Sequence, residues 1–170
     1  MEANSTSATR PARTPQAQLL GLVGFAAATV AAAALGGVAA GSSGEDYQQL
    51  RRPSWAPPSW LFGPVWTALY VLIAVAGWLV WRALGWRGAR RELTLYAAQL
   101  VLNAAWTPLF FLARRYGLAF AEIVALDVVL LATVVTFWRR HRLAGALLVP
   151  YLCWALFATA LNLAIWRLNR

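Results

Sequence analysis

Charged residues are scarce in this chain, and lysine is absent from it. Of the 170 residues only 12% are charged, whereas 61% are hydrophobic, and the mean hydropathy is +0.56. Soluble domains carry about 25% charged residues, so this composition excludes an ordinary water-soluble domain and indicates a membrane protein. The length is enough for one domain.

Cysteine and histidine each occur once, which removes several classes of chemistry. Cys153 lies in an apolar segment and has no second cysteine for an internal disulfide. His141 lies in an arginine-rich turn, where we expect it to be solvated, so haem ligation by a histidine inside a helical bundle is not expected. Because the sequence shows no nucleophilic triad, phosphate-binding glycine loop or metal-ligand cluster, we predict no metal site and no obligatory cofactor.

The net charge of +9 comes from arginine, since every basic residue is of that type. In a soluble protein such a charge would raise nucleic acid as a partner. Here the arginines fall between long apolar runs, where short basic loops set the topology of membrane proteins. No basic patch or binding module is visible, so we predict that nucleic acid is not a partner.

Five apolar runs make up most of the chain, and each is about 20 to 24 residues long, as a helix that spans a bilayer requires. The alternating pattern of a barrel is absent, and only helices or closed barrels satisfy their backbone in lipid. The sequence therefore predicts an all-α membrane protein, a bundle of five transmembrane helices. The expected elements are a disordered tail at residues 1–18 and one domain at residues 19–170, with helices at about 19–40, 60–81, 93–112, 118–138 and 143–166.

The first run has an alternative reading as a signal peptide cleaved after Ala40. Apolar regions of signal peptides are about 7–15 residues long, so the longer run favours a retained helix. Ala33, Gly37 and Gly41 follow one another at four-residue steps there, which allows close helix approach. The tail and the second and fourth loops carry more of the arginines than the other side, which favours a cytoplasmic N-terminus. Pro108 inside the third helix predicts a kink.

The stretch RRPSWAPPSWLFGPVWTALY, residues 51–70, joins a proline-rich loop to the second helix. The prolines fix φ and remove backbone donors, so residues 53–58 are predicted to form a stiff, non-helical lid. Two interpretations stay open: a ligand pocket beneath that lid, or an interfacial loop whose tryptophans only anchor the membrane. Three aromatic residues recur four apart at the following helix and share one face: Phe62, Trp66 and Tyr70.

Polar residues inside the helices fall in the half of the bilayer next to the first loop. Helix parity puts the first loop, the third loop and the C-terminus on one side, and Asn103 and Asp127 lie about 13 Å from it at the helical rise. Asn103 shares a helix face with Trp106, and Trp154 shares one with Ala158. Because polar side chains in lipid point to the bundle interior or a cavity, we predict an aromatic-walled cavity under the first loop, where Ala158 leaves room for a flat ligand.

Each of these features also has a purely structural explanation. Asn103 and Asn162 are equally well explained as residues that form hydrogen bonds between helices. Such a bond contributes about 0.6 kcal/mol on average. No basic residue falls in the interior, so Asp127 is expected to be protonated or bonded to neutral donors. Six tryptophans near helix ends are interpreted as interfacial anchors: Trp60, Trp78, Trp81, Trp86, Trp138 and Trp166.

Three motifs in order resemble one family: PSWAPPSWLFGPVWTALY at residues 53–70, LNAAWTPLFF at 102–111 and PYLCWALFATALN at 150–162. They resemble the tryptophan-rich sensory protein family, TspO/MBR, also called translocator protein or peripheral-type benzodiazepine receptor, over about residues 47–167. The resemblance implies a five-helix bundle, usually a homodimer, that binds porphyrins, haem and, in some members, sterols or isoquinoline-type drugs. The stretch LNLAIWR, residues 161–167, lacks the tyrosine of the animal sterol motif, so a sterol role is doubtful.

The resemblance therefore implies a tetrapyrrole-binding sensor, regulator or carrier with protoporphyrin IX or haem as ligand. The apolar runs predict a multi-pass protein with lipid around it, and the arginine- and alanine-rich composition indicates a bacterial cell membrane. One alternative is an enzyme, because Trp66 and Trp154 match tryptophans linked to light-dependent porphyrin breakdown, but conventional acid–base or metal chemistry is missing. The other is a small proton-coupled transporter that uses Asp127. The predicted ligand-binding residues are Tyr47, Trp55, Phe62, Trp66, Tyr70, Asn103, Trp106, Asp127, Trp154, Phe157, Ala158 and Asn162.

Overall fold

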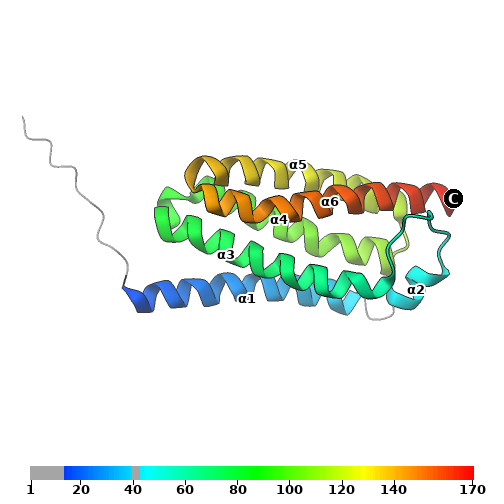
Figure 1. Cartoon of the computed structure of the whole chain (residues 1–170), viewed down its shortest axis with the longest axis horizontal. Helices are drawn as coiled ribbons and strands as arrows, with labels where there is room; N and C mark the ends of the chain where they lie inside the picture. The colour runs from blue at the N-terminus through cyan, green and yellow to red at the C-terminus, as the bar shows by residue number, and fades with distance from the viewer. Residues whose placement is uncertain (1–13, 40–42) are drawn as a thin grey trace, which may run out of the picture.

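Long helices make up almost all of the computed structural model, which describes residues 14–39 and 43–170 (Figure 1). The described residues contain no strand. In chain order the elements are α1 (Pro15–Ala39), α2 (Ser43–Gln49), the 3₁₀ turn η1 (Ser59–Leu61), α3 (Phe62–Gly88), α4 (Arg90–Thr107), the π-helical turn η2 (Pro108–Leu112), α5 (Tyr116–Arg140) and α6 (Arg142–Leu168).

Five of these segments are long and apolar enough to cross a bilayer. They are α1, α3, α4 with η2, α5 and α6, and the short α2 lies in the first connection. The prediction of an all-α, multi-pass integral membrane protein is confirmed. The large apolar side chains that stay exposed, such as Val71, Val101 and Val128, therefore face lipid rather than water.

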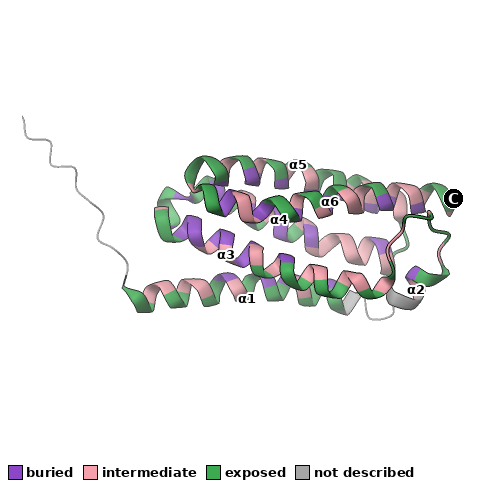
Figure 2. Cartoon of the chain, in the orientation of Figure 1, coloured by how far each residue is buried: buried purple, intermediate pink, exposed green. Residues whose placement is uncertain are grey.

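The five long helices run side by side, with α1 along one flank (Figure 1). The helices α5 and α6 share the largest interface, and α1 packs on α3 and α4. Gly77 lets α1, α3 and α4 meet, because a Cβ there would lie 2.8 Å from atoms of both Phe25 and Tyr96. Buried residues lie on the inward helix faces and exposed ones on the outer faces (Figure 2).

The first helix begins earlier than the sequence predicts. Residues 1–13 of the expected tail lie outside the described residues, as does Ala40 of the alternative cleavage site, but residues 15–18 are already helical. Thr14 explains this start, since its hydroxyl accepts a hydrogen bond from the Ala17 amide at 3.3 Å. Pro15 then occupies the first helical position, where its missing donor costs nothing.

The second connection is more helical than the predicted gap between helices at 60–81 and 93–112. The helical residues of α3 extend to Gly88, interrupted at Gly85, and α4 begins at Arg90. The chain turns at Gly85, which has φ 73° and ψ 172°, a conformation that glycine adopts without a Cβ clash. Trp81, predicted as an interfacial anchor, is only 7% exposed and packs near Phe25 instead.

Pro108 changes the helix type rather than simply bending it. Proline has no amide hydrogen to bond the preceding turn, and the chain widens into a π turn over residues 108–112. The Ala113 amide accordingly bonds the Pro108 carbonyl at 2.9 Å. Arg114 follows with φ 51°, a left-handed conformation that ends this segment before α5.

Candidate functional site

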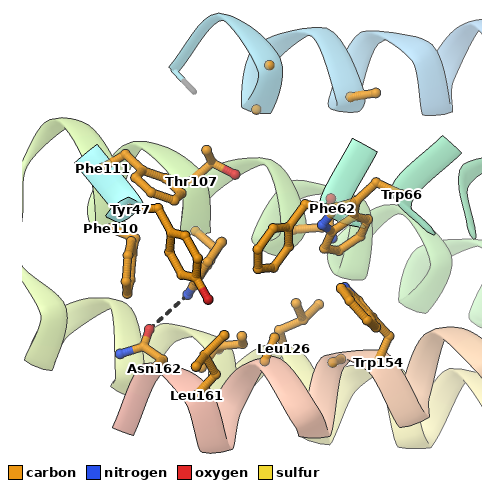
Figure 3. Close-up of a pocket in the computed structure, with 18 of the residues that line it drawn as sticks. Tyr47, Phe62, Trp66, Thr107, Phe110, Phe111, Leu126, Trp154, Leu161 and Asn162 are labelled. Atoms are coloured by element: carbon orange, nitrogen blue, oxygen red, sulfur yellow. Dashed lines mark hydrogen bonds between the residues drawn. The ribbon is translucent and has the colours of Figure 1, made fainter. Parts of the chain in front are cut away.

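A cavity of about 350 Å³ lies among the helices at the end of the bundle that carries the first loop (Figure 3). Its walls come from α1, α3, α4, η2, α5 and α6, and α2 and η1 contribute at its mouth. The structure brings most of the predicted site residues to this one cavity: Tyr47, Phe62, Trp66, Tyr70, Asn103, Trp106, Trp154, Ala158 and Asn162.

Aromatic rings support one another around the cavity (Figure 3). The Phe62 ring meets the Tyr47 ring edge-on at 5.3 Å and the Trp154 ring at 5.9 Å. The Trp106 ring stacks on Phe110, with centroids 5.0 Å apart. Such contacts hold each ring in place, so the cavity offers flat apolar surfaces of fixed orientation.

The first polar chain joins α3, α4 and α6. The Tyr70 hydroxyl donates to Asn103 Oδ1 at 2.7 Å, and Asn103 Nδ2 donates to the Tyr151 hydroxyl at 3.0 Å. Tyr151 is fully buried, and its ring lies edge-on to the Trp66 ring, with the two ring centroids 6.0 Å apart. This chain therefore holds two lining residues, Tyr70 and Asn103, and connects them to the core.

The second polar chain joins α4, α6 and the start of α5. Trp106 Nε1 donates to Asn162 Oδ1 at 3.0 Å, the dashed line that ends on Asn162 in Figure 3. Asn162 Nδ2 donates in turn to the Tyr116 carbonyl at 2.9 Å. The interhelical hydrogen bonds expected of both asparagines are thus present, while their ligand role stays a prediction.

Asp127 does not line the cavity. The Thr159 hydroxyl of α6 donates to Asp127 Oδ2 at 2.7 Å, so the expected neutral donor is there. Leu126 and Ile123 face the cavity instead. One residue step turns the helix by about 100°, so Asp127 points toward α6.

Glu122, the other carboxylate within α5, also lies outside the lining. Neither of its oxygens has a hydrogen-bond partner among the described residues.

Trp55 and Phe157 also stay outside the lining and form a layer behind it. The Trp55 ring, half exposed in the lid, meets the Phe157 ring edge-on at 5.8 Å. Phe157 lies 5.4 Å from the ring of Trp154, which does line the cavity. These two predicted residues therefore connect the lid to the cavity wall.

The lid itself is non-helical over residues 51–58, as the prolines predict. The Tyr47 hydroxyl donates to the Pro57 carbonyl at 3.0 Å, and the Arg52 guanidinium lies 4.7 Å from the Tyr47 ring centre. Burial raises the pKa of Tyr47 above its usual value of 10, although the hydrogen bond and charge of Arg52 lower it in part. Tyr47 therefore remains a hydrogen-bond donor at neutral pH.

Two further contacts fasten the lid and α2 to distant parts of the chain. The Arg51 amide donates to Asn169 Oδ1 at 3.1 Å, and Asn169 Nδ2 donates back to the Arg51 carbonyl at 2.9 Å. Arg114 pairs with Asp46 at 3.1 Å. Figure 1 shows the first connection beside the C-terminal end of α6.

Helix α1 supplies a cavity wall that the three sequence motifs do not predict. Ala33, Gly36 and Gly37 line the cavity, and a Cβ on Gly36 would lie 3.3 Å from the Thr107 hydroxyl. The four-residue spacing of Ala33 and Gly37 predicts close approach of α1 to another helix, and so indicated this wall. Gly41, the third residue of that series, lies outside the described residues. Phe110, one turn after Trp106, was detectable by the same spacing.

The chain is similar to known membrane proteins over most of its length. The sequence model of the TspO/MBR family matches residues 25–167. The human translocator protein is 43% identical over 125 residues, which cover 72% of this chain and 74% of that protein. The tryptophan-rich sensory protein of Cereibacter sphaeroides is 41% identical over 125 residues, 74% and 77% of the two chains. Protein CrtK of Rhodobacter capsulatus is 39% identical over 147 residues, 85% and 92%.

Proposed function

Because this chain belongs to the TspO/MBR family, we propose that it binds a tetrapyrrole, protoporphyrin IX or haem, in the cavity under its first loop. It then acts as a membrane sensor, regulator or carrier of that ligand. The observation that carries the proposal is the cavity wall, where the rings of Phe62, Trp66, Trp106 and Trp154 surround a space with few polar groups. Flat conjugated rings stack well on such surfaces.

The size and charge of the mouth refine this proposal. A volume of about 350 Å³ lies at the lower end of small-molecule pockets. A macrocycle therefore requires some movement of the lid, or leaves its edge in the mouth. Arg51 and Arg52 lie in the exposed lid there and are suited to meet the propionate groups of a porphyrin.

A titration of the purified protein in detergent with protoporphyrin IX tests the proposal, with tryptophan fluorescence as the readout. Saturable quenching in the micromolar range or tighter is expected, and Trp154→Ala and Trp66→Ala should each weaken affinity about tenfold or more through lost stacking area. Trp138→Ala is the matched control, since Trp138 is exposed and far from the lining. Quenching that never saturates, or that ignores both cavity variants, would remove the basis of the proposal.

A second candidate is light-dependent breakdown of the bound porphyrin. It is supported by the position of Trp66 and Trp154, two oxidisable rings that line one cavity from the neighbouring helices α3 and α6. The discriminating experiment illuminates the protoporphyrin complex and follows bleaching of its absorption. Trp66→Phe and Trp154→Phe should abolish bleaching and retain binding if this candidate holds, whereas bleaching at the wild-type rate in both variants excludes it.

Proton-coupled transport has weaker support, because Asp127 faces Thr159 between α5 and α6 rather than the cavity. We expect Asp127→Asn to leave porphyrin affinity within about twofold of wild type. Loss of substrate flux in proteoliposomes of this variant would support the transport proposal.

The homodimer implied by the family is also a proposal. Cross-linking of the protein in native membranes tests it.

A further inference from the structure

A second recess, of about 560 Å³, lies on the outside of the bundle between α4 and α5. It is at the end opposite the lid, where α4 begins and α5 ends (Figure 1). Its floor is apolar and includes Val128, Leu131 and Val135 of α5, and its rim is basic, with Arg91, Arg139 and Arg140. We call these six residues the basic groove.

The floor and the rim follow from one helical face. On α5 the floor residues and Arg139 recur at steps of three or four, so they lie above one another along that helix. Val128 and Leu131 are 65% and 52% exposed, and this exposure lies within the membrane span. The apolar floor therefore faces lipid and leads directly to guanidinium groups at the membrane surface.

A buried carboxylate organises the rim. Glu92 is 3% exposed, and its Oε1 accepts a hydrogen bond from Arg140 Nε at 2.9 Å. The Arg140 side chain stays 54% exposed, and its terminal nitrogens have no acceptor among the described residues. The recess is lined by three arginines and by one carboxylate, Glu92, which pairs with Arg140. The basic groove therefore retains a net positive charge.

We propose that the basic groove binds an anionic phospholipid, with the phosphate on the arginine rim and an acyl chain along the apolar floor. Guanidinium groups bind phosphate through paired hydrogen bonds, and basic pockets between transmembrane helices suit acidic lipid headgroups. The excess of arginine at this end of the bundle predicts that it lies in the cytoplasmic leaflet, where anionic lipids are enriched. A free phosphate would leave the apolar floor without a partner.

Native mass spectrometry of the full-length protein, released from nanodiscs of phosphatidylcholine with rising phosphatidylglycerol, tests the rim. We expect one retained phosphatidylglycerol in preference to phosphatidylcholine. Arg91→Gln/Arg139→Gln should weaken its retention about 25-fold, since each arginine near an anionic surface contributes about fivefold. Arg140 is kept in this variant, because its loss would leave the Glu92 carboxylate buried and unpaired.

The matched control is Arg87→Gln/Arg142→Gln, which removes the same charge from exposed positions on the same side of the bundle but outside the groove. We expect it to change retention less than twofold. An equal loss in both double variants would show diffuse surface attraction and overturn the proposal. Equal retention of the two lipids by the wild type would overturn it as well.

A second arm tests the floor. Ala132→Trp places a ring in the groove and should displace the lipid, whereas Ala160→Trp at an exposed position of α6, away from the groove, should not. Wild-type retention by Ala132→Trp would contradict an acyl chain on the floor. Inorganic phosphate at 10 mM (about the concentration of a buffer) should not release the lipid; full release would reduce the site to an anion site and overturn the proposal.

Discussion

Asn162 shows how one residue of the cavity wall serves the fold. It is 1% exposed, and its amide joins the Trp106 indole to the Tyr116 carbonyl. Removal of that amide leaves the Trp106 indole without the one acceptor described for it and takes a side-chain donor from the Tyr116 carbonyl, which lies at the first position of α5. A buried donor or acceptor left without a partner lowers stability by more than a typical hydrogen bond raises it. Truncation of Asn162 should therefore destabilise the fold by more than the hydrogen bonds themselves contribute.

We therefore expect Asn162→Ala to lower the free energy of unfolding by about 1–3 kcal/mol. Thermal unfolding of the detergent-solubilised protein measures the change. The control is Thr67→Val, because Thr67 is exposed and its hydroxyl bonds only the Gly63 carbonyl of its own helix. A loss no larger than that of the control would mean that water or a relaxed helix satisfies Trp106 and Tyr116.

At the scale of elements, two polar contacts of unequal strength tie the first connection to distant parts of the chain, in addition to the Tyr47–Pro57 bond and the Trp55–Phe157 contact. The Arg114–Asp46 ion pair involves a 68% exposed arginine, and exposed pairs contribute only about 0–1 kcal/mol. Asn169, by contrast, pairs with both the amide and the carbonyl of Arg51, so that two hydrogen bonds connect the end of α6 to the lid. Of these two contacts, we expect Asn169 to restrain the lid more.

Asn169→Ala should raise the rate of trypsin cleavage after Arg51 several-fold, because the lid opens locally more often. Cleavage is followed by mass spectrometry under conditions where the bundle stays folded. Arg167→Gln, a change at an exposed position of the same helix end, serves as control, and Arg114→Gln should have a smaller effect than Asn169→Ala. The assignment of Asn169 as the restraint would not survive equal cleavage rates in the wild type and Asn169→Ala.

The π turn at Pro108 positions aromatic residues that a regular helix would turn away. Phe110 and Phe111 both line the cavity and lie within this turn. Pro108→Ala restores the missing amide donor and allows an α-helix, which would rotate each later residue by up to about 100°. We expect porphyrin affinity to fall about tenfold while the midpoint of thermal unfolding stays equal or rises.

The control for that variant is Pro150→Ala, since Pro150 is exposed inside α6 and does not line the cavity. Hydrogen exchange over residues 104–113 reports whether the turn has changed. Unchanged exchange together with unchanged affinity would show that the surrounding packing, not the proline, maintains the π turn.

At the scale of the whole molecule, the two ends of the bundle carry different chemistry. The cavity and its lid occupy one end, and the basic groove and most arginines occupy the other. The positive-inside rule therefore predicts that the lid lies on the outer side of the membrane and the groove on the cytoplasmic side. In that orientation a ligand would enter the cavity from outside, and the proposed lipid would bind in the inner leaflet.

Cysteine labelling in intact cells tests this orientation. In a Cys153→Ser background, Arg115→Cys should react with a membrane-impermeant maleimide and Arg87→Cys should react only after lysis. Both positions are exposed at opposite ends of the bundle, so accessibility in the folded protein is matched. The reverse pattern would invert the topology and move the cavity mouth to the cytoplasm.

Much of this arrangement was predictable from the sequence because it depends on local and one-dimensional properties. Run length against bilayer thickness predicts five helices, and four-residue spacing predicts which face carries Phe62, Trp66 and Tyr70. The boundaries were less predictable. Thr14 and Gly85 control where α1 starts and how α3 and α4 are joined, through a hydroxyl cap and a positive φ that hydropathy does not register.

By itself the sequence determined the class of the protein, the number of helices, the proline-rich lid and, by its motifs, the family. Only the tertiary structure decided that α1 completes the cavity, that Asp127 faces Thr159 and that Trp55 and Phe157 form a layer behind the lining. The physical reason is that spacing along a helix gives relative directions, whereas the rotation of each helix in the bundle depends on how side chains from all its neighbours pack. One residue step changes that direction by about 100°, enough to move a side chain from a cavity to an interface.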